Sequence, residues 1–565
     1  MRAGRPDAAC GAALAVAAAS AAATRVAAND LWWHLRAGEW IVSHAAVPRA
    51  DAFSFTSAGT PWVDHGWLWQ VVAWLMHDHL GLAGLAILKL SSAALVAALS
   101  FAALRRRGVA PLPSVVVVLV CLAGARFRLT DRPEAASLAL FAIFAFVVLI
   151  ADLTPARRAL AAAAVSCLWA SVHAGVLLAP AIAGAASLGS FMEGTRARRA
   201  GRPGAAPALA RARGEGLAAA AAAAGALVNP YGLRIFLVPW KLGAALADPR
   251  LVNPEWLPPS MATFPLFHTV MAACIVWFAV RILRRHEASA WRSMLLVAGM
   301  GTLALSGARH IGFFFAALPF ALALARDAAD RPPAGPRGAV LATVLAAGAA
   351  VAFPLAPSPL AAPPGFGVDE SRFPVAESDY VASRLRAPRR LYNDVGQGGY
   401  LIWRLYPEDR VFIDGRNEVH AALLGEIAEA LDDGRGWASL LDRHDVRGAV
   451  VGYREQRIEV AGRPVEMARS FAALHFPRSK WALVFWGDAA MVFLRRGGEI
   501  DALISSDEYR FVHPEDAAYQ LERCRHGDQA LLAGVLGDLR RRVAASPRSA
   551  RAEDLLKTFG EIEPR

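Results

Sequence analysis

Cysteine is scarce in this chain of 565 residues, and no recognised metal or nucleotide motif takes its place. Four of the five cysteines lie in apolar runs and the fifth, Cys524, stands alone near the carboxyl end. The sequence therefore offers neither a disulfide framework nor a CxxC metal site. The spacing of its glycines fits neither a P-loop nor a dinucleotide fingerprint, and no HExxH motif occurs. These absences exclude several common classes of enzyme site.

Charged side chains are also depleted, at 19% of residues, whereas hydrophobic residues make up 56% and the mean hydropathy is +0.35. These values lie outside the range of ordinary soluble enzymes and place the chain among membrane proteins. The formal net charge is +12, but much of the arginine lies in short loops between apolar runs. This distribution is typical of membrane topology, and we therefore expect no nucleic-acid partner.

Long apolar runs are the dominant feature of the first 360 residues. A span of the hydrocarbon core needs about 17–25 residues. Runs of this length, or nearly so, occupy residues 8–28, 82–104, 111–127, 134–153, 158–172, 174–192, 216–230, 266–283, 292–307, 309–326 and 338–356. The sequence thus predicts a polytopic α-helical membrane protein with about eleven spans. The first run also resembles a signal peptide, but Arg25 and the lack of a clean cleavage signal favour an uncleaved span.

The arginines between the runs predict an orientation. Basic short loops occur at Arg105–Arg107, Arg157–Arg158, Arg196–Arg202 and Arg281–Arg292. With a cytoplasmic amino terminus, all of them fall on the cytoplasmic side, as the positive-inside rule requires. The first large loop, residues 29–80, and everything after about residue 360 then fall on the external, periplasmic side. We expect a multi-pass protein of the cytoplasmic membrane.

A polar segment follows the last span. Proline and alanine dominate residues 332–366, which mark the end of the transmembrane domain, 1–360. Residues 361–500 mix β-type runs with helical ones and predict a soluble α/β domain, followed by a helical extension at 501–565. The predicted strands are Arg410–Asp414, Arg447–Gly452, Trp481–Trp486 and Ala490–Arg495, and the predicted helices include Glu418–Leu431 and Gly436–Arg443. Two motifs, Asn393–Tyr400 and Asp414-Gly415-Arg416, indicate either a binding edge or a tight turn with a structural Asp–Arg pair.

The loop at 29–80 is unusually rich in aromatic and ionisable residues, with seven of the sixteen tryptophans and five of the fourteen histidines. Tryptophan prefers the membrane–water boundary, where its ring is half wet. We therefore expect a folded ledge on the bilayer surface that carries ionisable groups.

Arginines at external span ends run against the positive-inside bias and call for a reason. A guanidinium matches phosphate oxygens with two hydrogen bonds and stays charged when partly buried. The candidates for anion binding are Arg126, Arg128, Arg132 and Arg309. Pairing with Asp131, Glu134 or lipid headgroups is the alternative. The neighbouring polar residues His173, Glu255 and His310 could line the same cavity.

The order of motifs in the first loop resembles a known family. An acidic residue opens the loop within Asn29–Leu35, a helical segment ends at Gly38–Ile41, Pro48 and Asp51 follow, and a Gly-Pro-containing turn lies within Gly59–Leu68. This order resembles the first external loop of GT-C superfamily glycosyltransferases, such as protein O-mannosyltransferases and lipid A aminoarabinose transferases. The resemblance covers roughly residues 1–360 and implies a GT-C-like fold.

The resemblance implies a role for Asp30, which matches the acidic residue that acts as general base or orients the acceptor in that family. Relatives often carry two adjacent acids, whereas here the neighbour is Asn29. A carboxylate beside Trp32 and Trp33 at a membrane boundary would be partly desolvated, which suits proton abstraction. Capping of the helix that starts at Leu31 is the alternative.

Three further residues of the loop are candidates for chemistry. Asp64 and His65 could form a second acid–base pair or half of a metal site, and His34 shares a helix face with Asp30. Together they form a carboxylate–imidazole set that could hold a divalent cation. Interfacial packing of histidine against tryptophan is the alternative, and no cofactor is firmly predicted.

The resemblance implies a membrane glycosyltransferase that moves a sugar from a polyprenyl-phosphate donor to a glycan, lipid or protein acceptor at the outer face of the membrane. Trp32, Trp33 and Trp67 could stack on sugar or prenyl groups, with membrane lipids around them. The alternative is a non-catalytic lipid or glycan transporter, or an assembly component that uses its external domain for docking.

Overall fold

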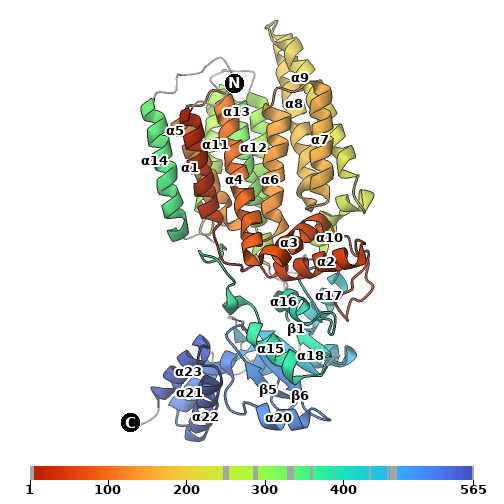
Figure 1. Ribbon diagram of the computed structural model, residues 1–565, viewed down its shortest axis with the longest axis vertical. Helices are drawn as coiled ribbons and strands as arrows, with labels where there is room; N and C mark the ends of the chain where they lie inside the picture. The colour runs from red at the N-terminus through yellow and green to blue at the C-terminus, as the bar shows by residue number, and fades with distance from the viewer. Residues whose placement is uncertain are drawn as a thin grey trace.

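The computed structural model describes residues 5–245, 253–283, 290–326, 336–356, 360–386, 389–431, 434–454, 457–458 and 468–562. Every predicted span falls largely on a helix in these ranges. The helices of the bundle are α1 (Arg5–Ala22), α4 (Leu82–Arg106), α5 (Pro111–Ala125), α6 (Pro133–Ala145), α7 (Pro155–Ala170), α8 (Leu178–Arg199), α9 (Ala205–Ala226), α11 (Pro265–Leu283), α12 (Ala290–Ser306), α13 (Ile311–Leu324) and α14 (Pro336–Ala352). They stand side by side along the long axis of the molecule (Figure 1).

The bundle has the surface of a membrane protein. Five helical segments in the described part are long and apolar enough to cross a bilayer: Leu82–Arg106, Pro111–Arg128, Pro133–Ile150, Ala174–Arg199 and Arg337–Leu355. Three shorter apolar helices accompany them, at Asp7–Ala22, Pro265–Arg281 and Ala308–Leu324. Apolar side chains also cover outer faces, as on α14, where Val340, Val344 and Val351 are exposed. A soluble helix would turn such residues inward, so these faces suit lipid.

The predicted ledge is a pair of helices. α2 (Asp30–His44) and α3 (Trp67–Leu80) pack against each other, and α2 also packs against α16 (Val395–Leu405). Both lie across one end of the bundle, between it and the carboxyl-terminal part of the chain (Figure 1). The sequence places apolar and aromatic residues such as Leu31, Trp32 and Leu35 on the buried face of α2. The ledge therefore joins the two parts of the molecule.

The carboxyl-terminal region is built on a four-stranded sheet with the order β1-β2-β6-β5. The strands are β1 (Leu391–Asn393), β2 (Gly448–Gly452), β5 (Trp481–Trp486) and β6 (Ala490–Arg495). β1 pairs with β2 in parallel, and the other pairs are antiparallel, with an irregularity between Leu483 and Phe485. A separate two-stranded sheet joins β3 (Arg457–Ile458) and β4 (Arg469–Ser470).

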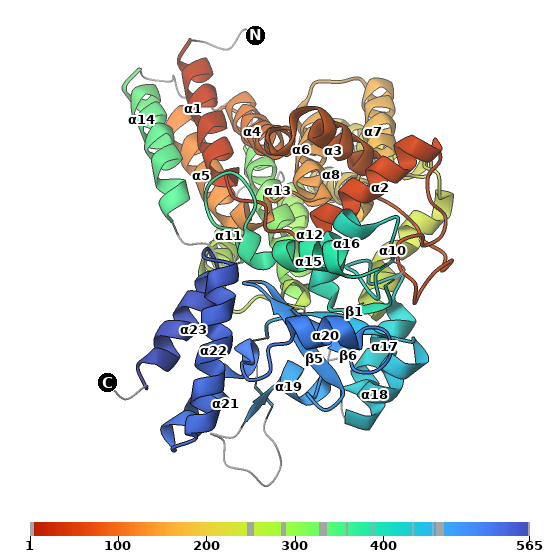
Figure 2. The same cartoon turned by 60° about the horizontal axis from the view of Figure 1, so that its bottom comes forward.

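Short helices surround these strands. They are α15 (Val375–Arg384), α16, α17 (Ala421–Ala430), α18 (Gly434–Arg443), α19 (Phe471–His475) and α20 (Asp501–Asp507). The chain ends in α21 (Ala517–Arg525), α22 (Gln529–Ala545) and α23 (Ala550–Gly560), which stand together beside the sheet (Figure 2).

One local prediction is wrong, and one of two alternatives is excluded. Residues Arg410–Asp414 form no strand, because Val411 makes only an isolated bridge to Ser54 of the first loop. The glycine motif Asn393–Tyr400 is not a tight turn but the end of β1 and the start of α16. The Asp–Arg pair that was expected at Asp414 and Arg416 is present.

A buried ion cluster ties the first loop to the carboxyl-terminal region. The Arg416 guanidinium lies 2.7 Å from an Asp51 oxygen and 2.6 Å from an Asp414 oxygen, and His420 lies 3.0 Å from Asp414. The charged groups of Arg416 and both aspartates are fully buried. The guanidinium also lies 4.7 Å from the centre of the Trp62 ring, which adds a cation–π contact. The cluster couples two segments that are more than 350 residues apart.

Replacing Arg416 by methionine should destabilise this junction, because two buried carboxylates would lose their counter-charge. Breaking a buried pair costs about 3–5 kcal/mol. We expect the thermal unfolding midpoint of the purified protein in detergent to fall by several degrees. Arg443→Met is the matched control, since Arg443 and Glu426 form a pair in which both side chains are exposed. This change should cost about 1 kcal/mol or less. Equal shifts for the two variants would contradict the assignment.

Candidate functional site

Asp30 begins α2 and has two side-chain partners. The indole nitrogen of Trp33 donates to Oδ1 at 3.3 Å, and the Arg132 guanidinium donates to Oδ2. The side chain is 23% exposed, so the carboxylate is partly desolvated, as expected for a position at the ledge. Because these partners are side chains, Asp30 is part of a polar cluster rather than a simple cap for its own helix.

Arg132 continues this cluster into the bundle. It lies just before α6, and its Nη1 donates to both oxygens of Glu255, at 2.9 and 3.1 Å. Glu255 comes from a short 3-10 helix, η5 (Pro254–Trp256). It also accepts from Arg128 at 2.8 Å, and Arg128 lies in the 3-10 turn η1 (Arg126–Arg128) that follows α5. The short segment that carries Arg128 and Arg132 and the distant η5 therefore meet at one carboxylate.

The cluster ends at Glu134 and Arg309. Glu134, in the first turn of α6, accepts from Arg128 at 2.9 Å and lies 3.8 Å from the guanidinium of Arg309. Arg309 lies in the 3-10 turn η6 (Ala308–His310) before α13, and its guanidinium lies 4.2 Å from the centre of the Trp256 ring. We call the chain Asp30–Arg132–Glu255–Arg128–Glu134–Arg309 the ion-pair network.

The ion-pair network has equal numbers of acidic and basic side chains, and these side chains range from almost fully buried to partly exposed. Carboxylates and guanidiniums alternate along it. Arg128 is almost fully buried, whereas Glu255 is 30% exposed. Although burial opposes ionisation, Arg132 and Arg128 hold the pKa of Glu255 down at about 2. Burial acts to lower the pKa of Arg132, but Asp30 and Glu255 raise it well above its ordinary value. Both groups are therefore charged at neutral pH.

Three histidines stand around the ion-pair network, and all three are neutral at pH 7. Burial is the main cause that lowers the pKa of His34, His65 and His173, the last to about 3. The charge of Glu134 reaches all three rings, which places them near the network.

The contacts of two of these histidines define their orientation. The Nδ1 atom of His173 accepts the N–H of Gly175 at 3.0 Å and lies 3.1 Å from the Ser137 hydroxyl, so its ring proton is on Nε2. The His34 ring lies 3.6 Å from the Trp33 ring, measured between centroids. Its Nδ1 lies 3.2 Å from the Gln70 amide nitrogen.

Asp64 is the carboxylate with the most unusual environment. It is 2% exposed, and Gln70 donates to its Oδ1 at 2.6 Å, whereas Oδ2 has no hydrogen-bond partner among the described residues. Burial raises the pKa of Asp64 to about 7, against weaker opposing effects of Gln70, Gly66 and Arg416. A carboxyl group that titrates near neutral pH can serve as an acid or a base.

Several predicted residues are bonded elsewhere. Arg126 donates to the backbone carbonyls of Ala21 and Ala356, at 3.3 and 2.6 Å, and so holds the ends of the bundle together. His310 lies 3.1 Å from the carbonyl of Leu303. These contacts are structural and lie outside the ion-pair network.

The surroundings of two predicted tryptophans differ. The Trp32 ring packs edge-on against Tyr400 of α16, with 5.0 Å between centroids. The Trp67 indole nitrogen is buried and has no hydrogen-bond partner among the described residues.

Other residues of the site were missed at the level of sequence. The sequence analysis named Glu134 only as a pairing partner for arginine. No sequence pattern marked Gln70, which lies between His34 and Asp64. Gly415 lies against Asp30, because a Cβ built on it would be 2.1 Å from the Asp30 Oδ1. Gly399 similarly faces the backbone of Asn29, where its Cβ would be 2.4 Å from the carbonyl oxygen. In the sequence, the signal for these close contacts was the glycines of the motifs Asn393–Tyr400 and Asp414-Gly415-Arg416.

The described residues contain no group of three or more His, Cys, Asp or Glu side chains that could hold a metal ion. Three of the four side chains predicted for a cation site have other partners, since Arg132 donates to Asp30 and Gln70 lies between His34 and Asp64. The Nδ1 of the fourth, His65, has no hydrogen-bond partner among the described residues.

A polar cavity of about 520 Å³ lies beside the ledge. Asn29, the neighbour of Asp30, lines it together with residues of the carboxyl-terminal region, among them Gln397, Arg454, Asp488 and Arg551. The Gln397 side-chain oxygen is buried and has no hydrogen-bond partner among the described residues.

Comparison with known proteins identifies the fold. No protein-family model matches the sequence, and no curated protein matches it either. Among solved structures, the archaeal oligosaccharyltransferase AglB from Archaeoglobus fulgidus, in complex with an inhibitory peptide and a dolichol-phosphate, is 12% identical with a TM-score of 0.52, over 98% of this chain and 86% of AglB. The apo oligosaccharyltransferase of that organism has 12% identity and a TM-score of 0.50, over 78% and 69% of the two chains. ArnT from Cupriavidus metallidurans bound to undecaprenyl phosphate has 13% identity and a TM-score of 0.34, over 85% and 96%.

These similarities show that the chain has a GT-C-like fold, and the resemblance expected from the first loop is confirmed at the level of the fold. The chain is a helical membrane protein with a small sheet.

The raised pKa of Asp64 predicts a pH dependence of stability. Because its pKa is higher in the folded state than in the unfolded state, the folded state binds the extra proton between about pH 4 and pH 7. The contribution of Asp64 to the free energy of unfolding is complete below about pH 4 and is lost as the pH rises to about 7. We expect the unfolding midpoint in detergent to fall between pH 5 and pH 8, and to fall less in Asp64→Asn. Asp78→Asn, on the exposed end of α3, should behave as the parent protein. Parallel profiles for Asp64→Asn and the parent would contradict this environment.

Proposed function

We propose that this protein is a membrane glycosyltransferase that moves a sugar from a polyprenyl-phosphate donor to an acceptor at the outer face of the membrane. One observation carries the proposal. Asp30, the residue that the first-loop resemblance marks as catalytic, is bonded to Arg132 in a network of arginines where the ledge meets the bundle of a GT-C-like fold.

The donor phosphate would bind at the guanidiniums of this network. In the resting structure each guanidinium faces a carboxylate, so a phosphate must replace one of these partners. Glu255 is the suited partner, because it is the most exposed acid of the network and bridges Arg128 and Arg132. Its departure would free two guanidiniums with bidentate geometry for phosphate oxygens. In support, AglB, which has this fold, is known in complex with a dolichol-phosphate.

Asp30 would act on the acceptor. As the acceptor oxygen or nitrogen bonds to the anomeric carbon, the carboxylate orients it and takes up its proton, while the bond from the anomeric carbon to the phosphate oxygen breaks. The arginines stabilise the negative charge that develops on the departing polyprenyl phosphate. Asp64, with a pKa of about 7, would be a second acid–base group. The ring of Trp67 would pack on the sugar or the prenyl chain, whereas Trp32 and Trp33 are buried.

The polar cavity beside Asn29 would receive the acceptor. Its lining mixes amides, acids and arginines, which suits a hydrophilic acceptor such as a glycan or a peptide. AglB in the related structure carries an inhibitory peptide. The acceptor would then approach Asp30 from the carboxyl-terminal side.

The bundle would cross the cytoplasmic membrane about eleven times, with the carboxyl-terminal region outside. The loops α4–α5, α6–α7 and α8–α9, which carry the clustered arginines, all lie at the end of the bundle opposite the carboxyl-terminal region (Figure 1). The positive-inside rule assigns that end to the cytoplasm. The ledge and the ion-pair network would then lie at the outer leaflet.

Asp30→Asn tests the catalytic assignment. The amide keeps the size of the side chain but cannot take up a proton, so transfer of lipid-linked sugar by membranes should fall by about 100-fold or more. Membrane insertion and the unfolding midpoint should stay close to those of the parent. Glu39→Gln is the matched control, because Glu39 lies on the same helix and forms only a partly exposed pair with Arg36. Full activity of Asp30→Asn would refute the proposal and favour a non-catalytic transporter or assembly component.

Cysteine labelling tests the orientation. Ser505→Cys lies on an exposed position of α20, and Ala200→Cys lies in the basic loop after α8. A membrane-impermeant maleimide should label the first in intact spheroplasts and the second only after lysis. The parent protein, whose cysteines are buried or half-buried in the described structure, sets the background. Labelling of Ala200→Cys from outside would reverse the proposed topology.

A further inference from the structure

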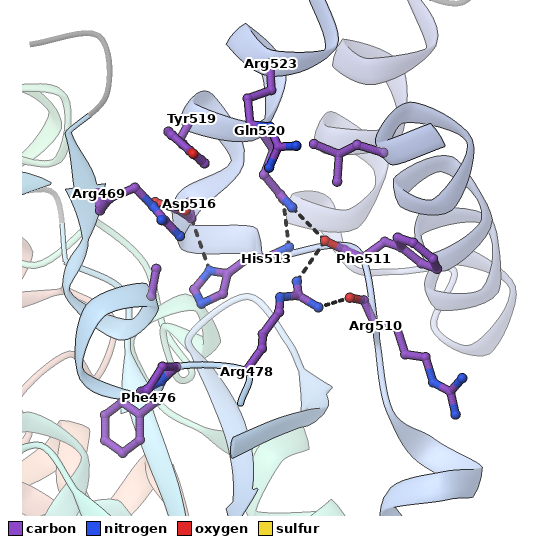
Figure 3. A pocket seen from close by; sticks show the side chains of 13 residues that line it. Arg469, Phe476, Arg478, Arg510, Phe511, His513, Asp516, Tyr519, Gln520 and Arg523 are labelled. Atoms are coloured by element: carbon purple, nitrogen blue, oxygen red, sulfur yellow. Dashed lines mark hydrogen bonds and ion pairs between the residues drawn. The ribbon is translucent and has the colours of Figure 1, made fainter. Parts of the chain in front are cut away.

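A second cavity, of about 400 Å³, lies beside His513 in the carboxyl-terminal region (Figure 3). Its polar side chains serve the fold. Arg478 donates to the backbone carbonyls of Phe511 and Val512, both at 2.8 Å. The side chains of Arg510 and Phe511 point away from His513 (Figure 3). These groups therefore hold the fold together and do not converge on a ligand. The surface of the bundle carries a feature of a different kind.

A short helical segment follows α9, at the end of the bundle where the ledge lies. It consists of the 3-10 helix η4 (Gly232–Leu237) and α10 (Val238–Ala245), which follow each other directly in the chain. In two views of the molecule, α10 lies near α2 and toward the side of the bundle (Figures 1 and 2). We call residues 232–245 the η4–α10 segment.

The exposed face of the η4–α10 segment carries large apolar side chains. Leu233, Leu237 and Trp240 are 72%, 53% and 72% exposed. Their spacing of four and three residues puts them on one face of a helix. The other face is buried in the protein, where Ile235 and Val238 are 0% and 3% exposed. A helix that is apolar on both its faces is typical of an apolar environment, so the exposed face requires a cover other than water.

Basic side chains border this apolar face. Arg234 and Lys241 are exposed, and each directly follows an exposed apolar residue, Leu233 or Trp240. Helices that lie in the interface of a bilayer have this composition: their apolar side chains enter the boundary of the acyl chains, and lysine or arginine reaches the headgroups. Tryptophan is itself enriched at that depth. The chemistry of the face therefore fits a lipid surface.

The apolar face also continues the outer surface of the bundle. Leu168, near the end of α7, is 47% exposed, and Val228, just after α9, is 64% exposed. The two helix ends meet there, because the Cys167 thiol donates to the Val228 carbonyl at 3.4 Å. η4 packs against the 3-10 helix η3 (Ala174–Leu177), which lies between α7 and α8. The lipid that covers the ends of α7 and α9 can therefore cover the η4–α10 segment as well.

Contacts at the start of the η4–α10 segment tie it to the first loop. The hydroxyl of Tyr231, the residue before η4, donates to the Pro48 carbonyl at 2.7 Å. The Arg49 guanidinium lies 5.2 Å from the centre of the Tyr231 ring, which adds a cation–π contact. α10 also packs against α17 of the carboxyl-terminal region. The protein thus fixes the orientation of the segment and directs its apolar face outward.

We propose that the η4–α10 segment is an interfacial anchor, whose side chains Leu233, Leu237 and Trp240 insert into the lipid leaflet at the ledge end of the bundle. Arg234 and Lys241 lie at the phosphate headgroups of the same leaflet. Because the segment is tied to the first loop, the anchor sets the depth of the ledge relative to the bilayer. The inference does not depend on the glycosyltransferase activity proposed above.

Spin labelling of the full chain in lipid nanodiscs tests the anchor. A nitroxide is attached to Leu237→Cys or to Trp240→Cys, so each variant keeps the other two apolar side chains. Oxygen concentrates among the acyl chains and a nickel chelate stays in water, so the ratio of the two accessibilities reports the depth of the label. A face that enters the bilayer by about 5–10 Å should raise this ratio about threefold or more over that of a residue in water. The signal of the parent protein, treated in the same way, is subtracted.

Two reference variants set the scale of this ratio. Ser505→Cys lies at an exposed position of α20, in water, and Val344→Cys lies on the exposed apolar face of α14. A ratio equal to that of Ser505→Cys would place the face in water and overturn the proposal. Low accessibility to both reagents would also overturn it, because a second copy of the chain or another protein would then cover the face. Both labelled positions are exposed, so the variants should fold normally, and the unfolding midpoint in detergent checks this.

Discussion

The guanidinium of Arg132 is the contact on which the arrangement of the site depends. It holds Asp30 of the ledge on one side and Glu255 of η5 on the other, so one side chain joins the ledge, the start of α6 and the loop before α11. Each carboxylate is partly removed from water, and the facing cation offsets the lost hydration. The orientation of α2 on the bundle is thus set by electrostatics as well as by the apolar face of the helix.

The carboxyl-terminal region contributes to the same site without placing a charge in it. Gly415 and Gly399 let its backbone approach Asp30 and Asn29 to a distance that no larger residue would allow. The buried Arg416 cluster fixes the segment that contains Gly415 against the first loop. Asp30 is therefore held from two directions, by Arg132 from the bundle and by glycine backbone from the carboxyl-terminal side. Such support from rigid neighbours suits the catalytic role proposed for Asp30.

The sequence predicts much of this fold, because its signals are local. Trp481–Trp486 and Ala490–Arg495 are strands as expected, since their apolar and aromatic residues suit a buried sheet. Residues 411–413 are also apolar, but Val411 bonds to the backbone of the first loop instead of to a sheet, a contact that no local pattern reveals. The same difference between local patterns and tertiary contacts applies to the site. Arg128 and Arg126 are two residues apart, yet one enters the ion-pair network and the other holds backbone carbonyls, because a single 3-10 turn directs them differently. The burial of Asp64, which is 2% exposed, is likewise a tertiary effect.

The charge balance of the ion-pair network bears on the choice of donor. Three guanidiniums close together without acids would repel one another, so the carboxylates stabilise the resting site. The same carboxylates compete with any incoming phosphate, and a free phosphate ion gains little by the exchange. A donor anchored in the bilayer by its prenyl chain brings additional binding energy from apolar contacts, and it is held next to the network at a high local concentration. For the proposed reaction, a neutral network at a membrane boundary would therefore favour a lipid-linked phosphate over a soluble one.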